Sequence, residues 1–430
     1  MPQTYKIEER AQTDPYALTR KLYKWEALFE YLCALLSTGG FLTKVSLTLG
    51  VRDSVIALIG TTASLACVLS MVSGYLQRYT PIKKWMLPLD ILTRVCRFGL
   101  YMLPFINLGS GVDIALFILV FVAQATTSMI NPAKQNLFLA PVAEERRTLH
   151  LAVVNMLSLL MGIPLLLFGG SFLDYMEAQG KMREAFLMIA GAILIFSVFH
   201  VLTLIFSKEQ PVTQASEHKN ILSDIHSLFR NKKFRFYLIT CSVHNIAQGV
   251  LTPYLTTYAQ KDFEFSMMVY GMFNAIQMLL GLCGFFFVRM FGKNIQPTLL
   301  RTVFFVAYAC YDFFWLVMTK ETAFAWHFPV VFAGGLITVS NIADTVLLFS
   351  IVEEKERVSA LAFVGAFMGV LTFATNLVIT PFFDLMQDNG VVLFGTPAYP
   401  QQILGIVSVG LRLLALTLWL FEKKQYKTKI

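Results

Sequence analysis

Apolar residues occur along this chain in long runs that short polar segments separate. A transmembrane helix needs about 20 mostly apolar residues, because roughly 30 Å of hydrocarbon is crossed at about 1.5 Å per residue. The runs predict helices at residues 26–47, 53–76, 85–107, 112–135, 149–173, 184–206, 235–258, 266–290, 298–319, 326–351, 358–383 and 401–421. We therefore expect an all-α integral membrane protein with about twelve transmembrane helices.

The segment 207–234 is the longest polar stretch between predicted helices, and it leaves six of them on each side. The expected domains are an N-terminal segment (1–25), a six-helix half (26–206), this linker, a second six-helix half (235–421) and a tail (422–430). In the linker, apolar residues from Ile221 to Phe229 follow a helical spacing beside Arg230. This pattern is typical either of an amphipathic helix on the membrane surface or of a solvated connector.

The two halves are similar to each other at one fixed offset. The identities at this offset include Asn131 with Asn341, Glu144 with Glu354, Arg147 with Arg357, and Asp174 with Asp384. Because they extend over two helices and the loop between them, we interpret them as an internal duplication that makes the halves pseudo-symmetric. Parallel six-helix repeats are a transporter architecture in which the substrate site lies at their interface and access alternates by rocking.

The composition agrees with this class: of 430 residues, 56% are hydrophobic and 14% charged, and the mean hydropathy is +0.62. The net charge of +8 reflects an uneven distribution of Lys and Arg rather than a nucleic-acid partner. The predicted outer loops hold only Arg52, Lys181, Arg183, Lys261 and Lys320. Since basic residues gather on the cytoplasmic side, we expect both termini to be cytoplasmic, in the cell (plasma) membrane.

Other functional classes lack support in the sequence. All six cysteines fall inside predicted helices without metal-like spacing, so neither disulfides nor a metal site is expected. The opening residues do not read as a removable signal peptide. No phosphate-binding loop, His/carboxylate metal spacing or nucleophile elbow is present, so we expect no enzymatic activity and no cofactor.

Two loop motifs carry a family resemblance. The segment SGYLQRYTPIKK after the second helix resembles the G-x-x-x-D-R-x-G-R-K signature of the major facilitator superfamily (MFS). Arg78 matches its arginine, whereas Gln77 replaces its aspartate. The segment GFFFVRMFGK after the eighth helix is a second copy, with Arg289 in register and Val288 in place of the aspartate. The resemblance implies that Arg78 and Arg289 are gating candidates.

The same resemblance implies that helices 1, 4, 7 and 10 line a central cavity. Helix 5 carries GIPLLLFGG, which is similar to a loosened antiporter motif of the family, but its spacing differs and it predicts no direction of transport. Polar groups in a bilayer are costly and should face a cavity or a partner. Helix 7 has such a polar stripe at His244, Gln248 and Thr252, and Gly249 and Pro253 are expected to bend its outer half.

The candidates for the substrate cavity are polar side chains that lie on stripes of this kind or on the helices beside them. They are Ser37, Gln124, Ser128, Asn131, Gln248, Thr252, Asn274, Gln277, Thr338, Asn341 and Asn376. On helix 1, Ser37 shares one face with Glu26, Glu30 and Lys44. The alternative is that such groups only join helices, at about 0.6 kcal/mol each.

Several charged residues lie within predicted helices. Glu30 and His244 are candidates for proton coupling, with a structural role as the alternative for each. Lys134 and Asp344 occupy equivalent positions of the repeat, so they either meet as an inner gate or each pairs locally with a neighbouring loop charge. A third set, Asp90, Arg94 and Arg97, follows a helical spacing on helix 3 and is interpreted as a structural network.

From these observations we expect a secondary active transporter that moves a small organic solute by alternating access and is coupled to protons. The expected partners are the lipid bilayer, a small-molecule substrate and protons, without nucleic acid. Within transport, import of a polar, sugar-like solute and export of a drug or metabolite both remain open. The alternative class is a receptor or scaffold that keeps the fold without transporting anything.

Overall fold

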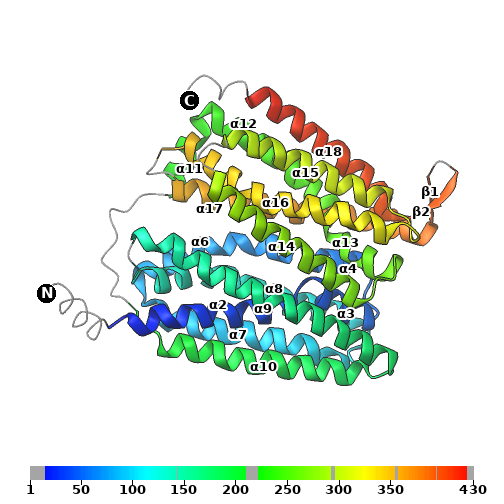
Figure 1. The fold of residues 1–430 in the computed structure, drawn as a ribbon, viewed down its shortest axis with the longest axis horizontal. Helices are drawn as coiled ribbons and strands as arrows, with labels where there is room; N and C mark the ends of the chain where they lie inside the picture. Colours follow the sequence, from blue (N-terminus) through cyan, green and yellow to red (C-terminus); the bar gives the residue numbers. More distant parts are fainter. Residues whose placement is uncertain are drawn as a thin grey trace, which may run out of the picture.

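The computed structural model describes residues 15–142, 144–209, 221–291, 296–353, 357–393 and 395–423. Its helices form two bundles that lie side by side, one from each half of the chain (Figure 1). Helix α2 begins at Ala17 and helix α18 ends at Lys423 at the same end of the molecule, on the left in Figure 1. The opposite end is called the outer end below, because the charge distribution predicts it to be external.

The N-terminal half corresponds to the first six predicted helices. Its elements are α2 (Ala17–Ser37), α3 (Gly39–Thr48), α4 (Asp53–Gly60), α5 (Thr62–Ala66), η1 (Cys67–Leu69), α6 (Ser70–Tyr79), α7 (Ile82–Met102), η2 (Leu103–Phe105), η3 (Gly109–Gly111), α8 (Val112–Leu139), α9 (Glu144–Ala178) and α10 (Met182–Phe206). Helix α2 begins at Ala17 and not at residue 26, so the first predicted span starts earlier than expected.

The C-terminal half corresponds to the other six. Its elements are α12 (Lys232–Leu251), η4 (Thr252–Tyr254), α13 (Leu255–Thr257), the π-helix η5 (Tyr258–Asp262), α14 (Met267–Phe291), α15 (Pro297–Val317), α16 (Ala323–Ile351), α17 (Arg357–Asn389) and α18 (Pro400–Lys423). A short antiparallel hairpin of β1 (Val391–Leu393) and β2 (Thr396–Ala398) precedes α18 at the outer end (Figure 1). The sequence did not predict this hairpin.

Two predicted helices are broken where they approach the other half. Helix 1 stops at Thr38, whose backbone is extended, and resumes at Gly39, whose φ of +53° is accessible mainly to glycine. A Cβ at Gly40 would lie 2.5 Å from the Tyr270 ring of the other half, so only glycine allows this approach. In helix 7, α12 ends at Leu251 and Pro253 lies in the turn η4, which confirms the predicted bend.

Nine of the described helices are long and apolar enough to cross a membrane. The three remaining predicted spans correspond to α2 with α3, to α7 and to α12. They contain Glu26, Glu30, Asp90, Arg94, Arg97, His244 and Gln248. The fold is thus all-α with several membrane-spanning helices. The three predicted spans that contain these polar residues are the ones that fall short of the hydropathy expected of a membrane helix.

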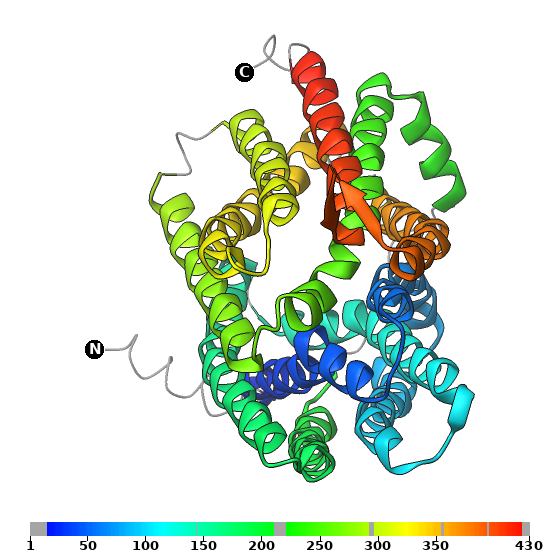
Figure 2. The ribbon, with the colours of Figure 1, turned by 90° about the vertical axis from the view of Figure 1, so that its right-hand side faces the viewer.

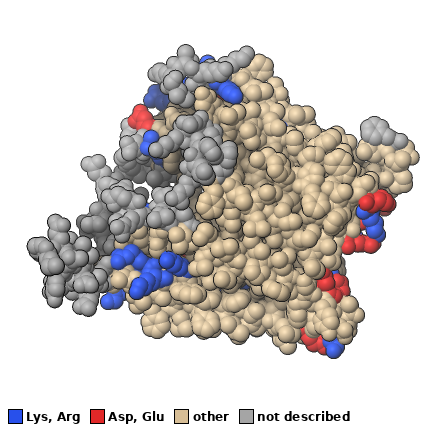
Figure 3. Space-filling view, viewed as in Figure 1, with Lys and Arg blue, Asp and Glu red and all other residues tan. Residues whose placement is uncertain are grey.

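The outside of the bundle is apolar and has charges at its ends. Large hydrophobic side chains face outward along the helices, such as Phe168, Phe199 and Leu385. On the face shown in Figure 3, the described Lys and Arg gather mainly at the end where α2 begins, whereas Asp and Glu gather at the outer end. An apolar belt between two charged ends is what a lipid bilayer requires.

The halves meet along two helix crossings. Helix α9 packs against α14, and α17 packs against α4, α5 and η1. A Cβ at Gly170 would meet the Met267 carbonyl at 2.6 Å, and one at Gly369 would collide with the Ser64 carbonyl. The glycines of the antiporter-like segment on helix 5 therefore allow close helix packing. Viewed from the outer end, the helices surround a central region to which both halves contribute (Figure 2).

The linker contains a helix, α11 (Ile221–Arg230), whereas its expected place on the membrane surface stays a prediction. Its Leu228 is buried in the core of the C-terminal half with Phe234 and Leu347. The Phe229 ring contacts that of Phe363 on α17, with centroids 5.6 Å apart. This helix therefore packs on the C-terminal half through its last turns.

Candidate functional site

A cavity of about 260 Å³ lies between the two halves. We call it the central cavity. It is lined by Gly39, Leu42, Thr43, Ile56, Gly60, Thr61, Ser64, Gln248, Thr252, Pro253, Thr256 and Thr372. Both breaks described above contribute to its wall, through Gly39 on one side and Pro253 on the other. Among the described residues that line it, none is an Asp, Glu, Lys or Arg, and most polar groups are hydroxyls.

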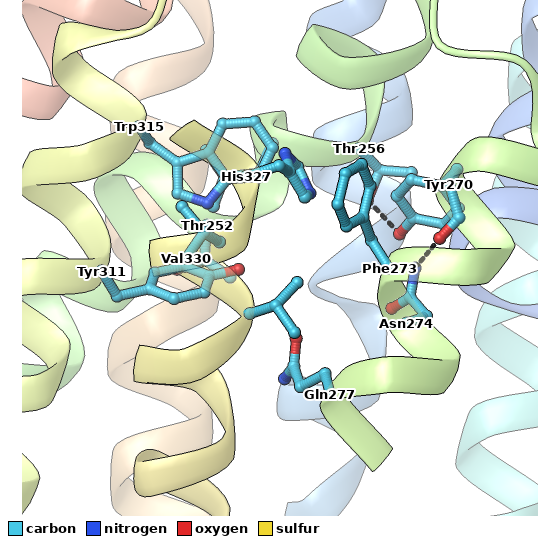
Figure 4. A pocket seen from close by; sticks show the side chains of 12 residues that line it. Thr252, Thr256, Tyr270, Phe273, Asn274, Gln277, Tyr311, Trp315, His327 and Val330 are labelled. Atoms are coloured by element: carbon cyan, nitrogen blue, oxygen red, sulfur yellow. Dashed lines mark hydrogen bonds between the residues drawn. The ribbon is translucent and has the colours of Figure 1, made fainter. Parts of the chain in front are cut away.

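A second cavity, of about 110 Å³, lies within the C-terminal half and is called the aromatic pocket. It is lined by Thr252, Leu255, Thr256, Tyr270, Phe273, Asn274, Gln277, Tyr311, Trp315, His327, Val330 and Val331. Figure 4 shows Tyr311 and Tyr270 on opposite sides of this space, with His327 above and Gln277 below. Thr252 and Thr256 line both cavities, so the aromatic pocket adjoins the central cavity.

The outer end of the interface is closed by polar contacts between the halves. Asp53 of the N-terminal half accepts hydrogen bonds from Lys261 Nζ at 2.8 Å and from Gln387 Nε2 at 2.7 Å. The Asp174 carboxylate accepts from the backbone N–H groups of Met267 and Met268, at 2.7 and 2.8 Å. This carboxylate caps the start of α14, where the helix dipole favours an anion.

Asp262 lies beside this closure, in the outer connection between α12 and α14. Its carboxylate accepts from Gln401 Nε2 at 3.0 Å. Burial, together with the nearby Asp53, raises the pKa of Asp262 to about 6, against the opposing effects of Lys261 and of the hydrogen bond from Gln401. The outer closure therefore contains an acid that can change its charge near neutral pH.

The N-terminal half buries a network of charges between α2, α7, α8 and α10. Arg94 pairs with Glu30 and, at 2.9 Å, with Asp90. Arg97 pairs with Glu30 at 3.0 Å. His200 Nε2 lies 3.3 Å from Asp90. Asp90, Arg94 and Arg97 of helix 3 thus form the network of charges that their spacing predicted, and Glu30 is part of it.

The C-terminal half buries a different arrangement around Arg412. Its Nε donates to Asp312 Oδ2 at 2.8 Å, and its Nη2 donates to Gln248 Oε1 at 2.8 Å. Its Nη1 approaches His244 Nδ1 at 2.9 Å, where only the imidazole nitrogen can accept. One guanidinium thus holds two of the predicted functional residues of helix 7, and its Cζ lies over the Tyr308 ring, 4.4 Å from the ring centroid.

Lys134 and Asp344 each pair within their own half. Lys134 Nζ lies 3.0 Å from Glu26, and Arg301 Nε lies 3.2 Å from Asp344. The structure therefore shows the local pairing that was the alternative, with charges on helices rather than on loops. An inner gate made by Lys134 and Asp344 stays a prediction for another conformation.

Comparison with known proteins agrees with this architecture. The model of the Major Facilitator Superfamily matches residues 28–376. The chain belongs to the Major Facilitator Superfamily. No curated protein matches it significantly in sequence.

Solved transporters share this MFS fold over nearly the whole chain. The nucleoside transporter NupG is 12% identical with a TM-score of 0.70, covering 94% of this chain and 99% of that one. A D-xylose-proton symporter is 16% identical with a TM-score of 0.66, covering 95% and 98%. A bacterial homologue of the human lysosomal transporter Spinster, inward-facing and unoccupied, is 11% identical with a TM-score of 0.61, covering 96% and 98%. These likenesses show the fold.

Within this MFS fold, only some predicted cavity residues lie at the two cavities. Gln248 and Thr252 line the central cavity, and Thr252, Asn274 and Gln277 line the aromatic pocket. Ser37 and Gln124 line a separate small pocket inside the N-terminal half, next to Arg97. Their contact with a substrate therefore stays a prediction.

The other predicted residues lie elsewhere or outside the described part. Ser128, Asn131, Thr338 and Asn376 do not line these cavities. Asn376 is fully buried and donates to the Gly249 carbonyl at 3.3 Å, which is the helix-joining role. The side chains of Asn341, Arg78 and Arg289 lie outside the described residues, so their predicted roles are not tested.

Sequence reasoning missed most of the aromatic pocket. Tyr311, Trp315 and His327 lie in apolar runs of α15 and α16 without a polar stripe, so periodicity does not single them out. Two signals were available: His327 is one of six histidines, and Trp315 is one of five tryptophans. A histidine near the end of a predicted transmembrane helix is a functional candidate by default.

Proposed function

We propose that this MFS protein is a secondary active transporter that moves a small, uncharged, polar organic solute by alternating access. The observation that carries the proposal is the central cavity, whose wall comes from both halves and whose polar groups are neutral. Taking a charge out of water without a partner costs several kcal/mol, so a cavity of hydroxyl and amide groups favours a neutral solute. Sites of this kind fix a ligand through a few placed polar groups.

The closure at the outer end supports alternating access. It consists of an ion pair and a few hydrogen bonds around Asp53 and Asp174, and such contacts contribute little net free energy each. Rocking of the halves could break them without disturbing either hydrophobic core, since the cores lie mainly within the halves. We propose that the arrangement is the outward-closed state of the cycle.

We further propose that Glu30 couples transport to protons. Its side chain is 16% exposed, more than Glu26 or Asp90, and it holds both Arg94 and Arg97. Protonation of Glu30 would release two guanidinium groups at once and rearrange α2 against α7. A similar role for His244 requires Arg412 to withdraw, because the guanidinium occupies the imidazole nitrogen.

Cross-linking of the outer closure tests the transport proposal. In a chain whose six native cysteines are replaced, Asp53→Cys and Lys261→Cys together place two thiols at the closure. Reconstituted in liposomes, this variant should exchange internal for external solute when reduced and stop when cross-linked. Exchange is measured with a panel of neutral sugars, nucleosides and amides.

The matched control carries Lys44→Cys and Glu177→Cys, which pair at 2.6 Å within the N-terminal half. Cross-linking that pair should leave exchange intact, because the halves stay free to rock. A folded protein that exchanges no member of the panel, in either form, would contradict the proposal and favour a receptor or scaffold.

A further inference from the structure

The aromatic pocket holds a buried imidazole that lacks a partner. His327 is 5% exposed, and its Nδ1 has no hydrogen-bond partner among the described residues. Its ring is surrounded by other rings, with centroids 4.4 Å from Phe273 and 4.9 Å from Trp315. Figure 4 shows the imidazole facing the space that these residues enclose. An unpaired buried polar group costs free energy, which a bound ligand with a matching group would recover.

The walls of the aromatic pocket favour a flat and uncharged group. Tyr270 and Tyr311 stand on opposite sides of the space and remain half-buried (Figure 4). A planar ring between them would bury its faces against two aromatic rings. No Asp, Glu, Lys or Arg is among the described lining residues, so a charged group would find no counter-ion there.

The pocket also offers both donors and acceptors to the edge of such a ring. The Asn274 amide donates to the Tyr270 carbonyl at 2.8 Å, which leaves its oxygen as an acceptor. Gln277 lies against Gly334, where a Cβ would come within 2.6 Å of its amide, so glycine makes room for this side chain. Amides that read donors and acceptors, together with aromatic stacking, are how proteins recognise nucleobases.

The central cavity begins where the aromatic pocket ends, at Thr252 and Thr256. Beyond them its wall carries the hydroxyls of Thr43, Thr61 and Thr372. Hydroxyl groups both donate and accept, so this wall suits a hydroxylated part of a ligand. One ligand that spans both cavities therefore has a ring at one end and hydroxyls at the other.

We propose that the substrate is a nucleoside, with its base between Tyr270 and Tyr311 next to His327 and its sugar in the central cavity. This inference rests on the proposed transport function and names the substrate class of the same site. It assigns His327, Asn274 and Gln277 to the edge of the base. It assigns the threonine hydroxyls to the sugar.

Binding and exchange of defined probes test the assignment. The purified full-length protein is heated with uridine, adenosine, uracil, ribose, xylose or glucose, and the same probes are then used in liposome exchange. A nucleoside should raise the melting temperature and exchange, because a ligand that binds the folded state stabilises it. Ribose and glucose should do neither at the same concentration.

Substitution of His327 locates the base. His327→Ala should weaken nucleoside binding about tenfold, the usual scale for one lost hydrogen bond in a buried site. His327→Gln retains a donor and an acceptor and should recover part of the affinity for the nucleoside. This variant also provides a test if His327→Ala does not fold. The matched control is His226→Ala, an exposed histidine on α11.

The outcomes separate the two proposals. Exchange of ribose or glucose without nucleosides would overturn the nucleoside assignment and leave the transport function standing. Unchanged nucleoside affinity in both folded His327 variants would overturn the placement of the base. Loss of exchange for every solute of the wider panel would instead contradict the transport function itself.

Discussion

The two halves share one helical plan but bury different chemistry. In the N-terminal half, Glu30 and Asp90 surround Arg94 in a network of several carboxylates and cations. In the C-terminal half, Arg412 pairs with Asp312 and otherwise contacts neutral groups among the described residues, and the same half contains the aromatic pocket. The comparison shows that the two halves keep a similar helical scaffold but bury different polar groups.

The largest expected difference is in stability. Asp312→Asn removes the carboxylate that pairs with Arg412, and both side chains are fully buried. The substitution should lower the free energy of unfolding by about 3–5 kcal/mol. Asp90→Asn should cost less, because Arg94 keeps Glu30. Unfolding in mixed detergent micelles gives both values.

The double variant Asp312→Asn with Arg412→Gln is the control, since it removes the unpaired charge and should recover part of the loss. Equal losses for Asp312→Asn and Asp90→Asn would erase the proposed difference between the halves.

The next effect concerns coupling. Glu30→Gln should abolish accumulation driven by a proton gradient but retain solute exchange, because a permanently neutral side chain still allows rocking. Glu264→Gln, which affects only the exposed pair with Lys320 in the C-terminal half, should retain both activities. The measurement compares gradient-driven uptake with exchange in the same liposomes. Accumulation that survives Glu30→Gln would argue against a coupling site in the N-terminal half.

A smaller effect is expected at the helix crossings. Gly369→Ala places a methyl group against the Ser64 carbonyl of the other half, and should destabilise the closed arrangement by about 1–3 kcal/mol. Gly365→Ala, one turn away on α17, has open space and serves as the control. Gly170→Ala tests the matching crossing of α9 with α14. Melting temperatures that do not distinguish Gly369→Ala from Gly365→Ala would refute the close packing.

The smallest effect is the pH dependence of the outer closure. The pKa of Asp262 is raised to about 6 in this arrangement, so the closed state holds its proton more tightly than an open one with an ordinary carboxyl near 3.9. Closure should therefore be favoured at acidic pH and weaken as the pH rises through about 6. Distances between spin labels at the outer ends measure it.

Asp262→Asn should remove this pH dependence. Glu264→Gln is the matched control, because that carboxylate is exposed and pairs with Lys320 outside the closure. A pH response that persists in Asp262→Asn would assign it to another group.

Hydropathy and the repeat were enough to predict two six-helix halves, because long apolar runs have few alternatives in a bilayer, and the two loop motifs then pointed to the MFS. The direction in which the polar side chains face was harder to predict. The stripe on helix 1 was visible, but helical phase does not say which neighbour it faces, and Glu26 and Glu30 point into their own half. The break at Gly39 was not foreseen, since small residues read as part of a continuous apolar run.

The candidate site was predicted only in part for a related reason. Gln248 and Thr252 follow a polar stripe, so periodicity found them. His327 and Trp315 meet only through packing between α15 and α16, and one sequence does not encode such long-range contacts visibly. The pairing of Arg412 with His244 is of the same kind.

The most direct test of the account is the accessibility of the central cavity from each side of the membrane. Thr256→Cys, in a chain without its native cysteines, places one thiol where the two cavities meet. Membrane-impermeant thiol reagents are then applied from either side of oriented liposomes. Alternating access predicts labelling from both sides, with outside labelling lost when the Asp53–Lys261 closure is cross-linked. Labelling from only one side under every condition would contradict it.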